Sequence, residues 1–380
     1  MNKNEDLYAL QLKRKRDLFL SFFSEFTKDL DCFPSPISNF RTRAELGVHV
    51  NDSINFTMIE NNKKIFIDNL EICDEKINNI INQLKKYVTD MESIKEKLFQ
   101  AEIQVARNGE GMVSLIYHKS LDTNWIEDAQ NLSSKIGVSI IGRSKKQKLV
   151  IGKDFVTETY KVKDQTIQID LYEQCFSQTN PYICDQMLSW VHERKDLSSD
   201  ITELHCGIGT FTALLSSIFS KVLATENSRP SIKALEKNLK NNVMTNVQFA
   251  RMSGLETLEA LNEVRVFNRL KHVNLKSLKR DVLFLDPPRS GVDSLSLDLI
   301  KQLNFKEIIY LSCGFSSLKS NVNDLLSDYS IEKAAFFDQF PFTDHLEAGV
   351  ILKKRVTTWL LAQAKLQTDL QPNHSLLLEK

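Results

Sequence analysis

The feature that most constrains the fold is a regular alternation of apolar strands with helices, which begins near Asn180. Parallel strands need a crossover connection, and a helix usually supplies it, so this alternation is typical of a doubly wound parallel sheet. Asn180 and Pro181 together predict a capped helix with proline at its first position. The segments of strand length are 200–204, 221–225, 247–251, 281–285, 307–312, 334–338 and 348–353. We therefore expect an α/β, doubly wound Rossmann-like domain in the second half of the chain.

The first half of the chain has a different pattern. Apolar residues recur at helical spacing over residues 8–26, which predicts an amphipathic opening helix. Over residues 44–67 the period changes to two, and Asn108-Gly109 separates two further strand-like runs, so we expect antiparallel strands joined by hairpin turns. The expected organisation is a strand-rich α+β domain over 1–172, whose opening helix can pack on the second domain, an α/β domain over 173–355, and an appendage over 356–380.

Length and composition fit two globular domains. The chain has 380 residues, of which 42% are apolar and 26% charged, as in an ordinary globular protein with a full core. The formal net charge is zero, which speaks against a strongly basic nucleic-acid binder. Basic residues nevertheless gather without acids over residues 142–153 and 265–280. Each run can neutralise backbone phosphates or form a solvated loop, and the sequence leaves both interpretations open.

The cysteines indicate reduced thiols. None of the six forms a C-x-x-C pair, and their spacing matches neither a zinc nor an iron–sulfur pattern. A chain of this length does not need a disulfide framework to fold. The first residues lack an apolar signal-peptide core, and no apolar run reaches membrane-spanning length. We therefore expect a cytoplasmic protein with no metal, no iron–sulfur cluster and no membrane partner.

A glycine loop follows the first expected strand of the second half. Gly207 and Gly209 allow the backbone to turn tightly before a helix that begins near Thr210, so a cofactor can approach the main chain closely. The next strand ends at Glu226, whose carboxylate can accept hydrogen bonds from both ribose hydroxyls of a nucleoside. This pattern predicts a nucleoside cofactor, with Gly207 and Glu226 among its contacts. A nicotinamide dinucleotide, or a turn needed only for packing, remains an alternative.

Three further strand ends carry reactive side chains. Asp286 opens a rigid Asp-Pro-Pro loop, which would suggest methylation of an exocyclic amine if an aromatic residue followed, but Arg289 follows instead. Cys313 ends the next apolar strand, as either a nucleophile or a small buried hydrophobe. Glu347 precedes the last strand and can act as a general base, with His345 as a rival. Asp286 and Cys313 are expected at the same carboxyl edge of the sheet as the glycine loop.

Taken together, these segments resemble the tRNA (uracil-5-)-methyltransferase family, whose members make ribothymidine in the T-loop of tRNA. The glycine loop departs from the family's usual Y-C-G-N-G-N at His205, Ile208 and Thr210. Ribosomal relatives usually bind an iron–sulfur cluster through cysteines that this chain lacks, which favours the tRNA branch. The resemblance extends over nearly the whole chain and rests on residues 8–12, 40–45, 113–119, 141–143, 176–180, 222–226, 286–291, 312–313 and 337–341.

The resemblance implies a methyltransferase that uses S-adenosyl-L-methionine to methylate C5 of uridine 54 in the tRNA T-loop. It makes Cys313 the nucleophile that adds to C6, and Glu347 the base. Positions that match cofactor contacts are Gln178, His205, Thr210, Glu226 and Asp286. The first domain then becomes an RNA-binding domain, and we expect a monomer that binds the T-arm. Expected RNA or substrate contacts are Arg41, Arg43, Arg143, Lys145, Lys146 and Arg289.

Other functions remain open at this point. One alternative is a C5-uridine methyltransferase that acts on another RNA, such as ribosomal RNA or tmRNA. A second is a non-catalytic protein that binds or folds tRNA. An amino-methyltransferase and a nicotinamide-dependent oxidoreductase are more distant alternatives, because Arg289 and Cys313 do not suit the former and the third glycine is missing for the latter.

Overall fold

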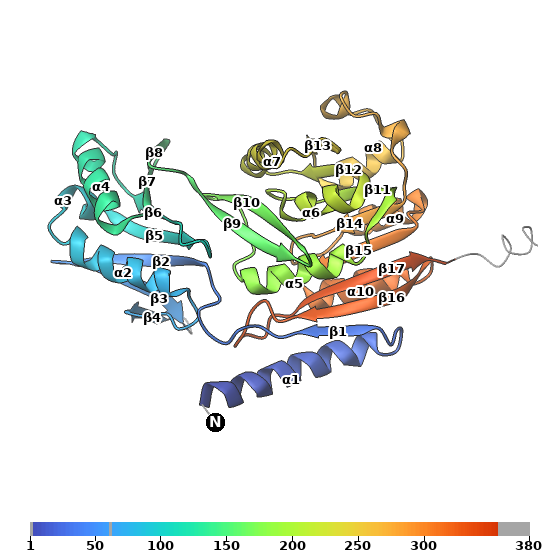
Figure 1. Ribbon diagram of the computed structural model, residues 1–380, viewed down its shortest axis with the longest axis horizontal. Helices are drawn as coiled ribbons and strands as arrows, with labels where there is room; N and C mark the ends of the chain where they lie inside the picture. Colours follow the sequence, from blue (N-terminus) through green and yellow to red (C-terminus); the bar gives the residue numbers. More distant parts are fainter. Residues whose placement is uncertain (1–2, 61–62, 356–380) are drawn as a thin grey trace, which may run out of the picture.

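The computed structural model describes residues 3–60 and 63–355, so the expected appendage over 356–380 lies outside the described residues. Two large sheets, each covered by helices, lie side by side and are connected by a two-stranded ribbon (Figure 1). Within the described part, no helix is both long and apolar enough to cross a membrane. The same residues contain no group of three or more His, Cys, Asp or Glu placed to hold a metal ion.

The C-terminal sheet confirms the expected doubly wound α/β class. Its strands, in spatial order, are β1 (Leu30–Phe33), β16 (Tyr329–Phe337), β17 (Glu347–Lys354), β15 (Glu307–Ser312), β14 (Val282–Leu285), β11 (Asp196–Leu204), β12 (Phe219–Glu226) and β13 (Val247–Arg251). Neighbours are parallel except β17, which is antiparallel to both β15 and β16. The sequence did not predict this reversal. The connection over residues 338–346 contains no helix, and a parallel crossover would need a longer one.

Helices cover both faces of this sheet and give it two buried layers. One layer includes Leu214 and Leu235, and the other includes Leu258, Ile300 and Leu318. The helices are α5 (Pro181–His192), α6 (Thr210–Ile218), α7 (Arg229–Asn241), α8 (Gly254–Leu261), α9 (Ser294–Leu303) and α10 (Phe315–Leu325).

The expected start of α5 is confirmed. The Asn180 side chain accepts a hydrogen bond from the backbone N–H of Ile183 at 3.3 Å, and Pro181 occupies the first turn. Capping satisfies one of the N–H groups that a helix start leaves without a partner. This helix therefore begins where the sequence alone places it.

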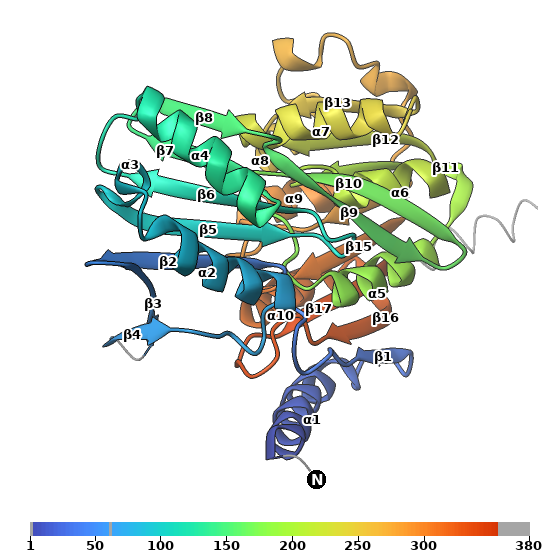
Figure 2. The same ribbon diagram turned by 60° about the vertical axis from the view of Figure 1, so that its left-hand side comes forward.

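The N-terminal segment packs on the C-terminal sheet. Helix α1 (Lys3–Phe23) buries Phe19 and Phe23 completely, and β1 lies parallel to β16. Figures 1 and 2 both show α1 alongside β1, on the outer side of this sheet. Helix α1 confirms the opening helix predicted from apolar periodicity, whereas β1 was not predicted. Its four residues are too few to show a clear alternation.

The second sheet contains the expected antiparallel strands. Its strands, in spatial order, are β4 (Lys63–Ile67), β3 (Ile54–Glu60), β2 (Arg43–Val50), β5 (Leu98–Val105), β6 (Gly111–Tyr117), β7 (Ser139–Ser144) and β8 (Gln147–Ile151). The hairpin predicted at Asn108-Gly109 joins β5 to β6, and Gly109 has the positive φ of 88° that such a turn requires. The helices of this part are α2 (Glu75–Val88), α3 (Glu92–Lys95) and α4 (Thr123–Ile136).

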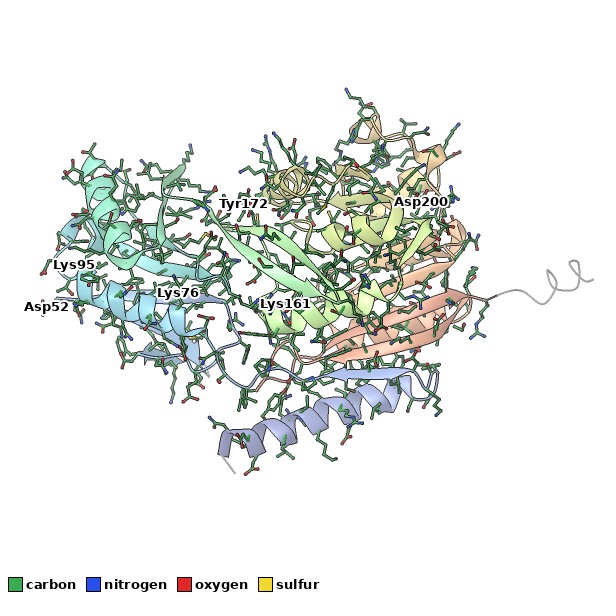
Figure 3. All side chains as sticks on the ribbon, in the orientation of Figure 1. Asp52, Lys76, Lys95, Lys161, Tyr172 and Asp200 are labelled. Atoms are coloured by element: carbon green, nitrogen blue, oxygen red, sulfur yellow. The ribbon has the colours of Figure 1, made fainter. Side chains whose placement is uncertain are left out.

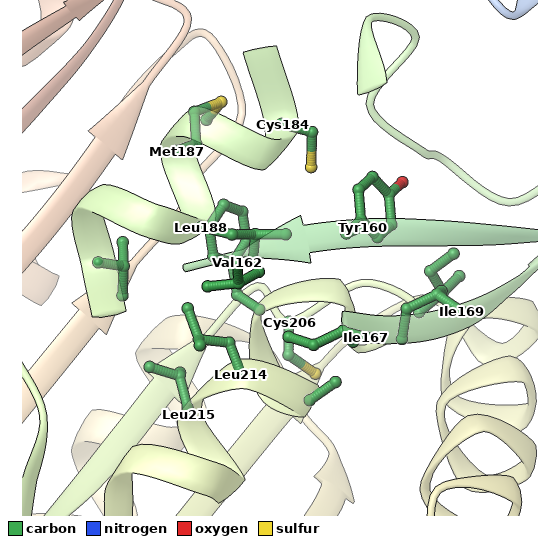
Figure 4. Close-up of a cluster of buried hydrophobic side chains, with 14 of the residues drawn as sticks. Tyr160, Val162, Ile167, Ile169, Cys184, Met187, Leu188, Cys206, Leu214 and Leu215 are labelled. Carbon is green, nitrogen blue, oxygen red and sulfur yellow. The ribbon is translucent and has the colours of Figure 1, made fainter. Parts of the chain in front are cut away.

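A ribbon of two antiparallel strands, β9 (Phe155–Val162) and β10 (Gln165–Tyr172), connects the two sheets. Figure 4 shows Val162 and Ile167 of the ribbon packed against Leu188 of α5 and Leu214 of α6. The ribbon therefore shares its core with the C-terminal sheet and fixes how the N-terminal sheet approaches that sheet.

Candidate active site

The predicted reactive residues gather at the edge of the C-terminal sheet that faces the N-terminal sheet. In Figure 1, β17 points away from the N-terminal sheet, so the carboxyl ends of the parallel strands β14 and β15 point toward it. Asp200, labelled in Figure 3, lies on the opposite side, near the amino end of the paired part of β11. Ligands of open α/β sheets bind outside the carboxyl ends of the strands. This edge is therefore the candidate active site.

The glycine loop between β11 and α6 contains consecutive turns of unusual backbone conformation. Positive φ angles occur at His205 (62°), Gly207 (56°) and Gly209 (94°), and α6 begins at Thr210 as predicted. A Cβ added to Gly209 would lie 2.5 Å from Leu235 Cδ1, so the helix packing requires glycine there. A Cβ on Gly207 would meet nothing within 4 Å. The loop is thus closed by packing at Gly209 and open at Gly207, where a ligand can approach the backbone.

Glu226 lies directly beside this loop. Its carboxylate accepts hydrogen bonds from the backbone N–H of Gly207 at 3.2 Å and from that of Ser228 at 2.6 Å. His205 is mostly buried nearby, and burial lowers the pKa of its imidazole, whereas the charges of Glu226 and Asp293 oppose that shift. Backbone amides therefore hold the Glu226 carboxylate in place at the end of β12, as a ribose-binding carboxylate requires.

Two further carboxyl groups at this edge have a raised pKa. Burial raises the pKa of Asp286 to about 7. Burial also raises the pKa of Glu203 to about 8, and the charges of Asp286 and Glu226 add to this shift. Thr212 donates a hydrogen bond to Glu203 at 2.6 Å. A cationic ligand at this edge would favour the ionised form of these acids.

Glu203 was missed from the sequence. The available signal was its position: Glu203 is the next-to-last residue of the strand before the glycine loop, and that strand lies inside the sheet with both neighbours paired. Buried carboxyl groups with a perturbed pKa gather at functional sites more often than elsewhere. Glu203 therefore joins the candidate site as a carboxyl group behind the glycine loop.

Cys313, Glu347 and Arg289 come together at the ends of β15 and β17. The register pairs Ser312 with Ala348, so Cys313 and Glu347 extend from adjacent strand ends. Burial raises the pKa of the half-buried Cys313 thiol, the charges of Glu347 and Asp286 raise it further, and the guanidinium of Arg289 opposes them. Cys313 is more accessible than the four buried cysteines, and its role as a nucleophile stays a prediction.

Glu347 is buried at only 2% exposure. Burial, and then the charge of Asp286, raises the pKa of Glu347 well above its usual range, whereas Arg289 lowers it. His345, the rival base, is exposed two residues earlier. Glu347 is therefore the candidate base that is buried beside Cys313, and this role stays a prediction.

Gln178 reaches the site from the loop between β10 and α5. Its side-chain oxygen accepts a hydrogen bond from Gln339 Nε2 at 2.8 Å, and Gln339 is buried in the loop that follows β16. The Gln339 side-chain oxygen itself has no hydrogen-bond partner among the described residues. Gln339 was not predicted from the sequence, although it lies in one of the segments that carry the resemblance.

Three of the arginines predicted to contact RNA are engaged within the protein. Arg41 donates to the backbone oxygen of Arg43 at 2.8 Å, and Arg43 donates to that of Cys175 at 2.9 Å. Arg143 Nε donates to the Glu173 carboxylate at 2.7 Å. The contacts of Arg43 and Arg143 tie the N-terminal sheet to the loop over residues 173–179, which precedes α5. Their role toward RNA stays a prediction.

The lysines at the β7–β8 turn are placed differently. Lys145 and Lys146 are exposed at this turn of the N-terminal sheet, and no ion pair joins either of them to a described residue. In the second basic run, Arg265 and Arg269 form ion pairs with Glu259 and Glu256, at 3.0 and 2.6 Å. Both runs therefore contain cations that pair within the protein, since Arg143, Lys148 and Lys153 of the first run also form ion pairs.

The doubly wound sheet and the open glycine loop define the Rossmann-like class of α/β enzymes, which bind their ligands at the carboxyl ends of the strands. The model of one family, described as tRNA (Uracil-5-)-methyltransferase, matches residues 7–355. The chain belongs to this family and is an enzyme of that kind.

Individual relatives agree with this assignment. The tRNA/tmRNA (uracil-C(5))-methyltransferase of Teredinibacter turnerae is 38% identical over 92% of this chain and 96% of its own length. The protein of the same name from Aliarcobacter butzleri is 39% identical over 91% and 93%. The crystal structure of Pyrococcus abyssi tRNA (uracil-54, C5)-methyltransferase, in complex with S-adenosyl-L-homocysteine, superimposes with a TM-score of 0.69. The superposition covers 91% of this chain and 83% of the Pyrococcus abyssi chain. The two sequences are 22% identical, so this likeness shows a shared fold.

Proposed function

We propose that this enzyme methylates C5 of uridine 54 in the T-loop of tRNA, with S-adenosyl-L-methionine as methyl donor, through a covalent bond between Cys313 and C6. The observation that carries the proposal is the meeting of Cys313, Glu347 and Arg289 at one strand edge. A nucleophile, a base and a cation at one place are what C5 methylation of a uracil needs.

The residues at the edge fit the methyl donor. Gly207 leaves the backbone open to a ligand, and Glu226 is held where it can accept from ribose hydroxyls. The remaining positions proposed to hold the donor are Gln178, His205, Thr210 and Asp286. Buried carboxyl groups with raised pKa values suit a ligand that carries positive charge. When bound, S-adenosylmethionine supplies a methyl group on a positively charged sulfur.

Cys313 begins the chemistry because C5 of uracil is a poor nucleophile. As the Sγ–C6 bond forms, the electron pair of the C5–C6 double bond moves toward the C4 carbonyl oxygen, and the enolate makes C5 nucleophilic. Arg289 is placed to favour the thiolate, because its positive charge lowers the pKa of Cys313. The same cation is proposed to stabilise the charge that develops on the uracil oxygen.

Glu347 completes the cycle. After C5 has gained the methyl group, Glu347 takes the remaining C5 proton, the electron pair restores the double bond, and the bond from C6 to Cys313 breaks. The thiolate then leaves and is available for another turnover. A positioned general base typically contributes a factor of about 10²–10⁴ in rate. Because burial raises its pKa, Glu347 is a stronger base than an exposed carboxylate.

The substrate uridine has to leave its stack before C6 can reach Cys313, at a cost of a few kcal/mol, roughly. We propose that exposed Lys145 and Lys146 offset part of this cost through phosphate contacts. We also propose that the enzyme works as a monomer in the cytoplasm. All six cysteines are free, which fits a reducing compartment.

A trapping experiment tests the mechanism. T-arm RNA with 5-fluorouridine at position 54 is incubated with the enzyme and S-adenosylmethionine, because fluorine cannot leave C5 as a proton does. We expect a protein–RNA band on a denaturing gel for the wild type and none for Cys313→Ala. With ordinary uridine, Glu347→Gln should accumulate a methylated adduct. Methylation of the RNA by Cys313→Ala would overturn the covalent route.

A second candidate substrate is tmRNA, because the relatives are named tRNA/tmRNA (uracil-C(5))-methyltransferases. The same gel with a tmRNA fragment that contains a T-arm tests it. Methylation of both RNAs would extend the proposal, and methylation of tmRNA alone would replace tRNA as the substrate.

A further inference from the structure

A buried ion pair joins the first helix to the loop in front of the proposed base. Lys15 of α1 is 3% exposed and Asp338 is 0% exposed, and the distance from Lys15 Nζ to Asp338 Oδ1 is 2.8 Å. The same ammonium donates to the backbone oxygen of Phe340 at 2.8 Å. Burial lowers the pKa of Lys15, whereas its hydrogen bond to Asp338 raises it.

Stability alone is a weak reason for such a pair. Two charges lose their hydration when they are buried, and well-packed apolar residues of similar volume often stabilise a fold equally well. Removing one partner is harmful mainly because the other charge is left buried. The pair does specify one arrangement of the two segments, because an ammonium donates only in defined directions and reaches two acceptors in the loop here.

The loop that Lys15 contacts connects two parts of the candidate active site. It spans residues 338–346, from the end of β16 to Glu347, the first residue of β17. Gln339, next to Asp338, donates to Gln178, which is a proposed contact of the methyl donor. A shift of this loop would therefore move the base and the donor-binding side together.

Helix α1 holds the loop at several points along one face. The Gln11 side-chain oxygen accepts a hydrogen bond from the backbone N–H of Phe342 at 2.8 Å, and Arg14 forms an ion pair with Asp344. The ring of Tyr8 lies 5.8 Å from that of Phe342. Figure 1 shows α1 passing beneath this end of the β16–β17 hairpin. Lys15 is the most deeply buried of these contacts.

We propose that Lys15 and Asp338 are positioning residues that hold the 338–346 loop, and with it Glu347 and Gln339, in the geometry needed for catalysis. This inference rests on the proposed function, because it assumes that Glu347 removes the C5 proton. Neither residue touches the uracil. Their effect reaches the reaction through the loop, so loss of the pair moves the base without removing it.

The kinetic consequence falls on one step. Proton removal follows methyl transfer, so a misplaced Glu347 should let the methylated Cys313–RNA adduct build up. A misplacement of about 1 Å can slow a step by about 10²-fold. A purely structural role would lower the unfolding midpoint and leave the ratio of the two steps unchanged.

The test uses the full-length chain and the double substitution Lys15→Met with Asp338→Asn, which removes both charges and keeps the side chains close in size. Single-turnover reactions with labelled S-adenosylmethionine and T-arm RNA measure methyl transfer, and a denaturing gel measures release of the adduct. We expect release to slow by about 10–100-fold and methyl transfer to slow less. Lys13→Met is the control, because Lys13 lies on the same helix at 73% side-chain exposure. It should behave like the wild type.

The outcomes separate this inference from the proposed function. If Glu347→Gln accumulates the adduct and the folded double variant does not, the positioning role is wrong. If the wild type neither methylates the T-arm nor forms the 5-fluorouridine adduct, the proposed function is wrong. If the double variant does not fold, Gln11→Met decides, since it removes only the acceptor for the Phe342 N–H. Adduct above the wild-type level then supports the inference, and an unchanged level overturns it.

Discussion

Replacing Arg289 with methionine should make Cys313 less reactive at neutral pH. Burial raises the pKa of the Cys313 thiol, so at neutral pH the thiolate is a minor species and its fraction sets the reaction rate. The Arg289 guanidinium lowers that pKa, so its loss must raise the pKa and reduce the thiolate fraction. Contacts between opposite charges at exposed positions typically contribute about 0.2–1 kcal/mol. Since Arg289 is exposed, screening leaves about 1 kcal/mol, or roughly a fivefold lower thiolate fraction.

Alkylation with iodoacetamide across a pH series measures this effect directly, without RNA. Cys32 is the one fully exposed cysteine and four others are buried, so a Cys32→Ser background lets the label report on Cys313. The rate at neutral pH should fall about fivefold in Arg289→Met, and its midpoint should move to higher pH. Lys301→Met, which removes a cation of α9 that does not act on Cys313, should leave the profile unchanged. An identical profile for Arg289→Met and wild type would refute the thiolate contact.

Two further predictions concern the glycine loop and the basic turn. Gly209→Ala should lower the free energy of unfolding, measured in urea, by roughly 2–4 kcal/mol. The backbone at this position has a positive φ, and the Cβ of the introduced alanine would lie 2.5 Å from Leu235 Cδ1. Gly207→Ala should lower the free energy of unfolding by only about 1–2 kcal/mol, and it should also weaken S-adenosylmethionine binding measured by calorimetry. Unchanged affinity would mean that no ligand approaches the backbone at this position. Reversing the charges of Lys145 and Lys146 should weaken T-arm binding and flatten its dependence on log salt by roughly two units; an unchanged slope would remove them from the interface.

Local patterns account for most of the architecture of the second half. Strand and helix periodicity, together with the cap at Asn180, predicted the strands, the helices and their parallel arrangement, because each pattern reflects burial of one face or one stripe. The same reasoning placed Gly207, Asp286 and Cys313 at one edge, since the carboxyl ends of parallel strands share an edge. Their chemical roles depend on groups from other strands and stay predictions.

Charge was harder to interpret than periodicity. A sequence shows that Arg43 and Arg143 are cationic but does not show which groups they contact. In the structure both arginines contact the loop over residues 173–179. Lys145 and Lys146 look similar in the sequence and lie exposed in the structure. The difference arises because burial and partner choice depend on elements that are distant along the chain.

The sequence by itself therefore determined the fold class, the family and the strand-end residues, since these follow from short-range spacing and from contiguous motifs. Only the tertiary structure decided that β17 reverses direction, that Glu203 is buried behind the glycine loop, and that Lys15 pairs with Asp338. Lys15 and Asp338 are 323 residues apart, and nothing in either local sequence specifies the other. Their contact, like the raised pKa of Glu347, comes from packing that removes water around groups brought together by the whole fold.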